Sequence, residues 1–213
     1  MSDFIADIRR DYDTDGFSEA DLATNPLEQF STWFNEASRT EQNDVNVMTL
    51  ATATPDGKPS ARIVLLKGVD EGFVFFTNYE SHKGKELTLN PHASLVFWWP
   101  SLARQVRVEG RVEKIAEAES DAYFGSRPRG SRIGAIASPQ STVIENRRTL
   151  EDSVRALEER YGENDEIPRP EGWGGFRLRP VLVEFWQGRA SRLHDRLRYR
   201  AEGEEWIIER LAP

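Results

Sequence analysis

The segment from Trp186 to Arg196 holds the densest group of side chains that could bind a charged ligand. It reads WQGRASRLHDR and contains three arginines and His194, the only histidine of the last hundred residues. In an extended strand, Arg192, His194 and Arg196 would share one face and Leu193 would lie on the other. This pattern predicts a basic face that meets an anionic ligand. A solvated strand at a sheet edge could have the same composition.

The charge of the whole chain limits the classes of ligand. A formal net charge of -8 over 213 residues argues against a general nucleic-acid binder, which needs a broad positive face. Local positive charge in an acidic chain suits a small phosphate or carboxylate ligand. The hydrophobic content of 38% predicts a single folded domain, residues 1–213, with helical additions in about residues 1–45.

Several residue types and segments are absent. The chain has no cysteine, which excludes disulfides, a thiolate nucleophile and zinc-finger spacing. The three histidines are too scattered for an obvious metal site, so no metal is predicted. The N-terminus lacks the apolar core of a signal peptide, and no apolar run is long enough for a membrane helix, so we expect a cytoplasmic protein.

Strand patterns outnumber helical ones. Helices are predicted from Ser2 or Asp3, from Pro26, after Ser81, and at 117–126 and 145–161; strands are predicted at 47–54, 60–67, 73–77, 93–99, 105–115, 176–188, 191–199 and 204–211. Short turns predict an antiparallel meander for the first three strands, and residues 127–144 read as loop-rich. The order favours a mainly β, α+β protein, an antiparallel barrel or sandwich, over a doubly wound sheet.

Other basic and polar groups lie at strand ends and in loops. Arg62 and Lys67 are separated by an odd number of positions, so they face the same way only if their strand bends or ends first. Thr77 ends a strand, and His82 and Lys83 follow at a helix start, where backbone N–H groups favour an anion.

Three more groups could contact a ligand. Gln105 begins a strand and offers both a donor and an acceptor to a heterocycle. The loop from Arg127 to Arg132 contains three arginines and Ser131, and it is suited to cradle a phosphate. Gln140 and Ser141 follow Pro139 in a turn that could begin a helix.

Taken in order, these segments resemble the pyridoxine/pyridoxamine 5′-phosphate oxidase family over essentially the whole length. The matching strings are RRDY, RIVLLK, FFTNYESHK, RQVRVEG, YFGSRPRGSRIGAIAS with PQS, GWGGFR, VEFWQG, RLHDR and ERLAP. The resemblance implies a homodimer of FMN-binding split barrels with FMN at the subunit interface. It also implies oxidation of pyridoxamine or pyridoxine 5′-phosphate to pyridoxal 5′-phosphate by dioxygen, with release of hydrogen peroxide.

The resemblance also implies residue roles. Arg62 and Lys83 would hold the FMN phosphate and Gln105 the flavin ring; the other implied FMN contacts are Lys67, Phe76, Thr77, His82, Gln140, Ser141, Trp186 and Arg196. Lys67, Tyr123, Arg127 and Ser131 would hold the substrate phosphate. Arg192 and His194 would be the catalytic pair over the substrate's pyridine ring, with Arg9 and Tyr12 as a lid.

One departure and two alternatives accompany the resemblance. The family usually has Ser-Arg-Lys where this chain has Ser81-His82-Lys83, and a largely neutral histidine would remove a fixed charge beside the FMN phosphate. A flavin reductase with the same barrel and a non-catalytic phosphate or vitamin carrier are the other readings. The presence of both SRPRGSR and RLHDR favours the oxidase, because a reductase needs no second phosphate site.

Overall fold

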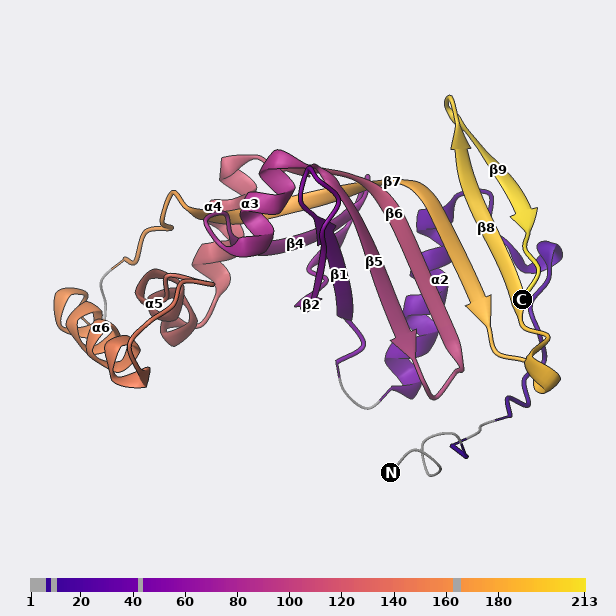
Figure 1. The fold of residues 1–213 in the computed structure, drawn as a ribbon, viewed down its shortest axis with the longest axis horizontal. Coiled ribbons are helices and arrows are strands. Elements are labelled where there is room, and N and C mark those ends of the chain that lie inside the picture. The colour runs from indigo at the N-terminus through magenta and orange to yellow at the C-terminus, as the bar shows by residue number, and fades with distance from the viewer. Residues whose placement is uncertain (1–6, 9–10, 42–43, 163–165) are drawn as a thin grey trace. The chain divides into compact units, whose positions relative to one another are not determined.

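The computed structural model describes residues 7–8, 11–41, 44–162 and 166–213 (Figure 1). Its helices are α2 (Pro26–Thr40), α3 (His82–Leu89), α4 (Glu117–Ser126), α5 (Arg129–Ala137) and α6 (Arg147–Arg160), with short 3-10 turns η1 (Glu19–Asp21) and η2 (Ala190–Arg192). Its strands are β1 (Val47–Ala53), β2 (Pro59–Leu65), β3 (Gly68–Val69), β4 (Phe73–Asn78), β5 (His92–Trp99), β6 (Arg104–Lys114), β7 (Trp173–Gln187), β8 (Asp195–Glu202) and β9 (Glu205–Arg210). The predicted α+β class is confirmed. The helix predicted from Ser2 or Asp3 falls largely outside the described residues.

The strands form one sheet in the order β2-β1-β5-β6-β7-β4-β3, with β8 between β7 and β9. The pairs β3–β4, β4–β7, β7–β8 and β8–β9 are antiparallel. The chain forms two compact units: unit 1 comprises residues 1–50, 94–110 and 180–213, and unit 2 comprises residues 51–93 and 111–179. It passes from one unit to the other four times, within β1, β5, β6 and β7.

The core of unit 1 forms where α2 packs on the sheet (Figure 1). The helix begins at Pro26 as predicted, because the fixed φ of proline suits the first helical turn. Its apolar face buries Phe30 and Trp33. The Trp33 ring lies 5.1 Å from Phe185 of β7, and the Phe30 ring lies 4.9 Å from Phe97 of β5.

Helices α3 to α6 all belong to unit 2. Helix α3 begins after Ser81, whose Oγ accepts a hydrogen bond from the Gly84 N–H at 3.3 Å, and it ends before Asn90, as predicted. A second cluster buries Phe124 of α4, Ile133 of α5 and Trp173 of β7 together. This cluster fixes the helices beside the end of β4.

The predicted meander is confirmed only in part. Strands β1 and β2 are neighbours, but β4 pairs with β7 and β3. The register joins Phe73 to Leu178 and Asn78 to Trp173. The connection to β4 is made by the residues after β2: the Lys67 N–H donates to the Val74 carbonyl, and β3 pairs with β4. Gly72 also lets β7 approach closely, since a Cβ there would collide with the Leu178 carbonyl.

The loop predicted for residues 127–144 contains a helix. Pro128 stops α4 from continuing, as expected, but it stands at the start of α5, where proline leaves no hydrogen bond unmade. The N–H groups of Ser131 and Arg132 both donate to the Pro128 carbonyl, at 2.9 Å and 3.1 Å. Gln140 and Ser141 therefore follow a helix and do not begin one.

Candidate active site

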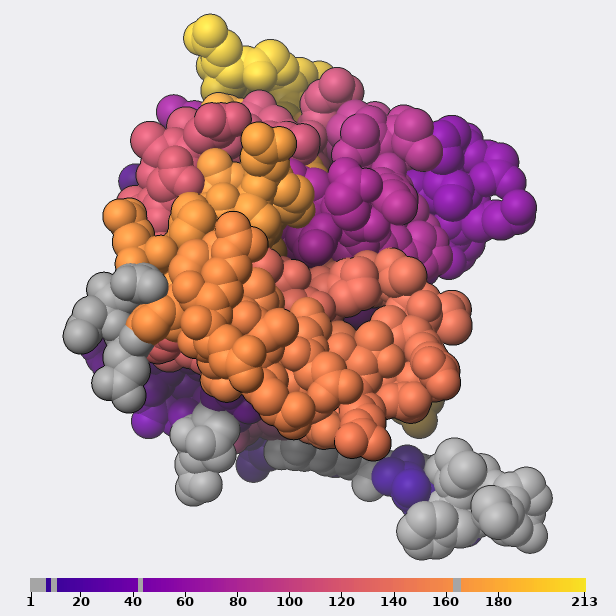
Figure 2. Space-filling view, turned by 90° about the vertical axis from the view of Figure 1, so that its left-hand side faces the viewer, coloured from indigo at the N-terminus to yellow at the C-terminus, as the bar shows by residue number. Residues whose placement is uncertain are grey.

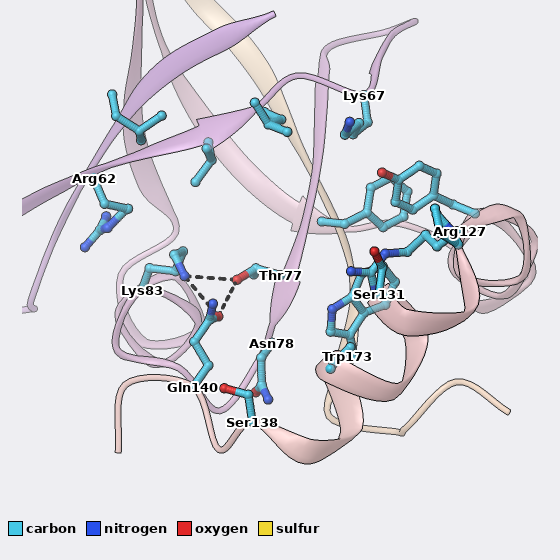
Figure 3. A pocket seen from close by; sticks show the side chains of 18 residues that line it. Arg62, Lys67, Thr77, Asn78, Lys83, Arg127, Ser131, Ser138, Gln140 and Trp173 are labelled. Atoms are coloured by element: carbon cyan, nitrogen blue, oxygen red, sulfur yellow. Dashed lines mark hydrogen bonds between the residues drawn. The ribbon is translucent and has the colours of Figure 1, made fainter. Parts of the chain in front are cut away.

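A cavity of about 830 Å³ opens in unit 2 between β2, the end of β4, and helices α3, α4 and α5. Figure 2 shows a recess between the magenta surface around α3 and the orange surface of α5 and α6, and Figure 3 shows the lining side chains. The lining includes four cationic side chains and no acidic one. Nine residues predicted to bind the cofactor or the substrate line it: Arg62, Lys67, Phe76, Thr77, Lys83, Tyr123, Arg127, Ser131 and Gln140.

Arg62 and Lys67 both line this cavity despite their odd spacing. Strand β2 ends at Leu65, so Lys67 is no longer bound by strand alternation. The Lys67 N–H donates to the Val74 carbonyl of β4 at 2.8 Å. Because β2 ends before Lys67, both side chains can line the same cavity, which their spacing in the sequence could not decide.

Lys83 carries a buried ammonium with neutral partners only. It is 9% exposed, and its Nζ donates to Thr77 Oγ1 at 3.1 Å, to Gln140 Oε1 at 3.2 Å and to Ser81 Oγ at 3.4 Å (Figure 3). Burial, and next the charge of Arg62, lower the pKa of Lys83 below its ordinary value. No carboxylate among the described residues forms an ion pair with this ammonium. An anion would therefore find an unneutralised positive charge here.

Arg127 places a positive charge at the end of the cavity opposite Lys83 (Figure 3). Its guanidinium lies 4.8 Å from the Trp173 ring, and its Nη1 is buried without a hydrogen-bond acceptor. Burial lowers the pKa of Arg127 below its ordinary value. Tyr123 stacks on Phe76 with ring centroids 3.9 Å apart. A ligand oxygen at this end would satisfy the unpartnered nitrogen.

A second hollow, of about 650 Å³ in unit 1, has a different charge balance. It is also lined by arginines, but carboxylates neutralise them. Arg104 pairs with Glu36, and Arg210 donates to both Glu19 and Asp195 at 2.8 Å. The first cavity therefore suits an anion better than the second hollow, where carboxylates already neutralise the arginines.

Three predicted aromatic residues lie together in unit 1. The ring of His194 is 4.5 Å from Trp186, and the ring of Tyr12 is 5.8 Å from Trp186 and 6.0 Å from His194. The Arg189 N–H donates to His194 Nδ1 at 3.0 Å, so this nitrogen carries no proton. Burial, and next the charge of Arg192, lower the pKa of His194. The neutral ring keeps a proton at Nε2 that can be donated.

The prediction of one extended basic face is wrong before Asp195. Residues 190–192 form η2, and the strand begins only at Asp195. Ser191 and Arg192 have φ values of 57° and 62°, which reverse the chain direction and end the alternation. Leu193 does not anchor a strand, because it is 70% exposed.

Arg196 lies within β8 and is held by an acidic side chain. Its Nε donates to Glu184 Oε1 at 2.7 Å, and this hydrogen bond raises the pKa of Arg196. The side chain of Glu184 is 3% exposed and also faces Arg107 Nη2 at 2.9 Å. Gln105 lies half-buried in β6 of the same unit.

Three predicted residues lie outside the groups described above. The Nε2 of His82 is 3.1 Å from Glu86 Oε1, and the His82 side chain is 65% exposed and does not line the cavity. Ser141 is exposed with a φ of 71° and also lies outside the lining. Arg9 falls outside the described residues.

Glu86 is the residue that sequence reasoning missed. It lies on α3 with a side chain 4% exposed and faces Arg62 Nη2 at 3.3 Å. The sequence predicts a solvent-exposed side chain for this glutamate, because it lies in a helix that also contains lysines. The only signal in the sequence is its four-residue spacing from His82, which places both on one helix face.

Two family profiles and the full-length relatives point to one and the same family. Residues 34–161 match the family profile described as pyridoxamine 5′-phosphate oxidase. A protein of Gloeothece citriformis (strain PCC 7424), named pyridoxine/pyridoxamine 5′-phosphate oxidase, is 57% identical over 215 residues, 100% of both chains. The chain belongs to the pyridoxamine 5′-phosphate oxidase family. Its relatives in this family are oxidoreductases by name, and residues 173–213 match the profile described as the pyridoxine 5′-phosphate oxidase C-terminal dimerisation region.

Solved structures confirm the split-barrel fold expected of this oxidase family. PhzG from Burkholderia lata 383, in complex with tetrahydrophenazine-1-carboxylic acid, is 30% identical with a TM-score of 0.87 over 93% of this chain and 98% of its own. A pyridoxamine 5′-phosphate oxidase-related FMN-binding protein from Nostoc punctiforme PCC 73102 is 19% identical with a TM-score of 0.71 over 90% of this chain and 100% of its own. Among the described residues, none of the helices is long and apolar enough to span a membrane.

Proposed function

We propose that the protein is an FMN-dependent oxidase that converts pyridoxamine 5′-phosphate and pyridoxine 5′-phosphate to pyridoxal 5′-phosphate, with dioxygen as the electron acceptor. The observation that carries this proposal is the cavity of unit 2, where four cations and no carboxylate form the charged lining of a chain with net charge -8. Each of the two ligands carries a phosphate, and two phosphates close together repel each other unless cations lie between and around them.

The cations fall into two groups that suit two phosphates. Arg62 and Lys83 lie toward one end of the cavity in Figure 3, and Lys67 and Arg127 toward the other. We assign the first group to the FMN phosphate, together with Thr77 and Gln140. We assign the second to the substrate phosphate, with Tyr123 and Ser131 contributing hydroxyl groups. Gln140 is exposed, so its amide can turn away when a phosphate oxygen takes its place on Lys83.

The other predicted residues are assigned to the rings of the two ligands. Gln105, Trp186 and Arg196 would contact the flavin. Arg192 and His194 would lie over the pyridine ring of the substrate. His194 is neutral, so it orients the substrate by donating from Nε2, and the charge of Arg192 stabilises negative charge that develops during the reaction.

Bound FMN would supply a two-electron oxidant for the exocyclic carbon of the substrate, with dioxygen as the final electron acceptor and hydrogen peroxide as its reduced product. The protein's own contribution is to hold the substrate phosphate at Lys67 and Arg127, fix the ring with Arg192 and His194, and exclude competing reactions. For the amine substrate, two-electron oxidation would give an imine, and water would hydrolyse it to the aldehyde and ammonia. Tyr12 lies against Trp186 and His194 and would cover the substrate.

The assembly that we propose is a homodimer with FMN at the subunit interface. The match of residues 173–213 to a dimerisation region supports it. The same region contains Trp186, Arg192, His194 and Arg196, so ring-binding residues and dimer contacts would come from one segment.

The ligand in the PhzG complex, tetrahydrophenazine-1-carboxylic acid, suggests a second class of candidate substrate, a ring compound with a carboxylate. Such a compound carries no phosphate and would leave Lys67 and Arg127 without a dianionic partner. The buried, unpartnered Nη1 of Arg127 therefore favours the phosphorylated substrate.

The test uses the purified protein loaded with FMN and passed through a desalting column. A flavin absorption spectrum followed by equal amounts of hydrogen peroxide and pyridoxal 5′-phosphate, after addition of pyridoxamine 5′-phosphate in air, would support the proposal. A flavin spectrum without peroxide would favour a carrier, and flavin-dependent oxidation of a nicotinamide without pyridoxamine phosphate would favour a reductase.

Arg192→Leu provides the matched variant for this assay. It should retain bound FMN and lose turnover by about 10²-fold, because it removes charge stabilisation from the reacting substrate only. Loss of the flavin spectrum in this variant would contradict the division of roles between the units.

A further inference from the structure

Arg62 reaches the cavity from a network of side chains on three elements of unit 2. Its Nη1 donates to Thr52 Oγ1 of β1 at 2.6 Å, and its Nη2 donates to Ser60 Oγ of β2 at 2.5 Å. The same Nη2 lies 3.3 Å from Glu86 Oε2 on α3. The Arg62 side chain is 21% exposed and lines the cavity, and these contacts limit its orientation.

Glu86 organises the hydroxyl groups of this network. Its Oε2 accepts from Thr52 Oγ1 at 2.5 Å and from Ser60 Oγ at 2.7 Å. A hydroxyl group has one hydrogen and two acceptor positions. Because each hydroxyl gives its hydrogen to Glu86, each must present lone pairs to Arg62. The Glu86 carboxylate thereby orients the lone pairs of both hydroxyl groups toward the Arg62 guanidinium.

Glu86 remains ionised despite its burial. Burial would raise its pKa, but hydrogen bonds from Ser60 and Thr52, with the charges of His82 and Arg62, outweigh burial and lower the pKa below its ordinary value. His82 faces the second oxygen of this carboxylate, Oε1, at 3.1 Å. His82 therefore contacts Glu86 and does not line the cavity.

We propose that Glu86 is a positioning residue for the phosphate of FMN: it fixes Thr52 and Ser60, and through them Arg62, in the orientation that binds the phosphate. This inference rests on the proposed function. Glu86 itself does not line the cavity.

The direction of the change in FMN affinity distinguishes a positioning role of Glu86 from a direct electrostatic effect of its charge. By Coulomb's law alone, removing a carboxylate near an anion site tightens anion binding. If Glu86 positions Arg62, its removal weakens binding, because the guanidinium loses its two ordered acceptors and its ionic partner. The two effects have opposite directions, so one measurement distinguishes them.

The experiment is a fluorescence titration of the full-length apoprotein with FMN, which requires no turnover. Glu86→Gln should raise the FMN dissociation constant about tenfold or more, the usual effect of losing a charged hydrogen bond. Glu80→Gln is the matched control, since it removes the same charge from a side chain that is 76% exposed just before α3. The control should bind as tightly as the wild type or slightly more tightly.

A double-mutant cycle tests whether Glu86 acts through Arg62. In an Arg62→Leu background, Glu86→Gln should cause no further weakening, because the group that it positions is gone. An additive loss in the double variant, or unchanged or tighter binding in Glu86→Gln alone, would overturn the inference. If Glu86→Gln does not fold, Ser60→Ala takes its place, with weaker binding expected and unchanged binding as the contrary result.

Failure of the inference and failure of the proposed function give different results. A wild-type protein that does not bind FMN would contradict the proposed function. A wild-type protein that binds FMN while Glu86→Gln binds equally well would contradict only the role of Glu86.

Discussion

A buried ammonium without a carboxylate partner destabilises a folded chain, and Lys83 carries one. Its acceptors, Thr77, Ser81 and Gln140, are neutral oxygens. Replacing a buried charge by an apolar side chain of similar length often leaves stability unchanged or higher. An anion bound beside Lys83 would offset this cost.

Lys83→Met should therefore separate stability from binding. We expect the free energy of unfolding of the apoprotein to stay the same or rise by about 1 kcal/mol, while the FMN dissociation constant rises about tenfold or more. Chemical denaturation and FMN titration measure the two quantities. A variant that is less stable but binds FMN normally would show that Lys83 is structural.

The pH dependence of the same variant gives a second check. Burial lowers the pKa of Lys83 below 10.5 in the folded protein, so the unfolded chain binds more protons between the two values. Stability of the wild-type apoprotein should rise with pH as the pH increases through the folded pKa toward 10.5, and Lys83→Met should lack this rise.

Sequence reasoning named all four charged residues of the cavity, because the strings that resemble the oxidase family contain them. It could not find Glu86, whose role depends on burial under β1 and β2. It also could not decide whether Arg62 and Lys67 share a face, because that depends on where β2 ends.

At the scale of elements, the junction between β4 and α3 places Thr77 and Lys83 side by side. The junction is tight at Gly84, where a Cβ would collide with the backbone carbonyls of Tyr79 and Asn78. Only glycine allows the first turn of α3 to lie against the end of the strand.

Gly84→Ala should lower the free energy of unfolding by about 1–3 kcal/mol, because the new methyl group forces the helix start away from β4. The matched control is Gly125→Ala in α4, where nothing lies near the added Cβ and alanine favours the helix by up to about 1 kcal/mol. Thermal or chemical unfolding measures both. Equal stability of the two variants would contradict the close packing at this junction.

The elements that sequence reasoning placed correctly are those with local signals. Pro26 and Ser81 mark helix starts, and alternation marks most strands. The errors have two causes: pairing with segments distant in the sequence, and backbone conformations that composition does not reveal. Helix α5 is hidden by glycine and proline, and β4 joins β7 although β2 precedes it in the chain. Arg192 looks extended because its positive φ leaves no trace in composition.

At the scale of the whole molecule, the outer part of the β7–β8–β9 surface exposes apolar side chains. The register pairs Val183 with Tyr199 and Tyr199 with Ile208, so Val181, two residues from Val183, shares their face. Val181 is 54% exposed and Ile208 is 39% exposed. Both fall in the matched dimerisation region. Apolar side chains that remain exposed on one face of a sheet suit a second copy of the chain.

The double variant Val181→Asp with Ile208→Asp should weaken the proposed homodimer about tenfold or more, because two charges would be desolvated at the contact. Sedimentation velocity over a range of concentrations measures the change. Val143→Asp is the matched control, since this valine is 97% exposed in a loop of unit 2. A double variant that dimerises like the control would place the contact elsewhere.

The four passages of the chain between its two compact units have a consequence for inheritance. Strands β1, β5, β6 and β7 each supply residues to both units, so neither unit is a continuous stretch of gene. A single recombination event cannot exchange the cation-lined cavity of unit 2 for that of another protein and leave the strands of unit 1 intact. An exchange of residues 51–179 as one piece therefore also replaces residues 94–110 of unit 1.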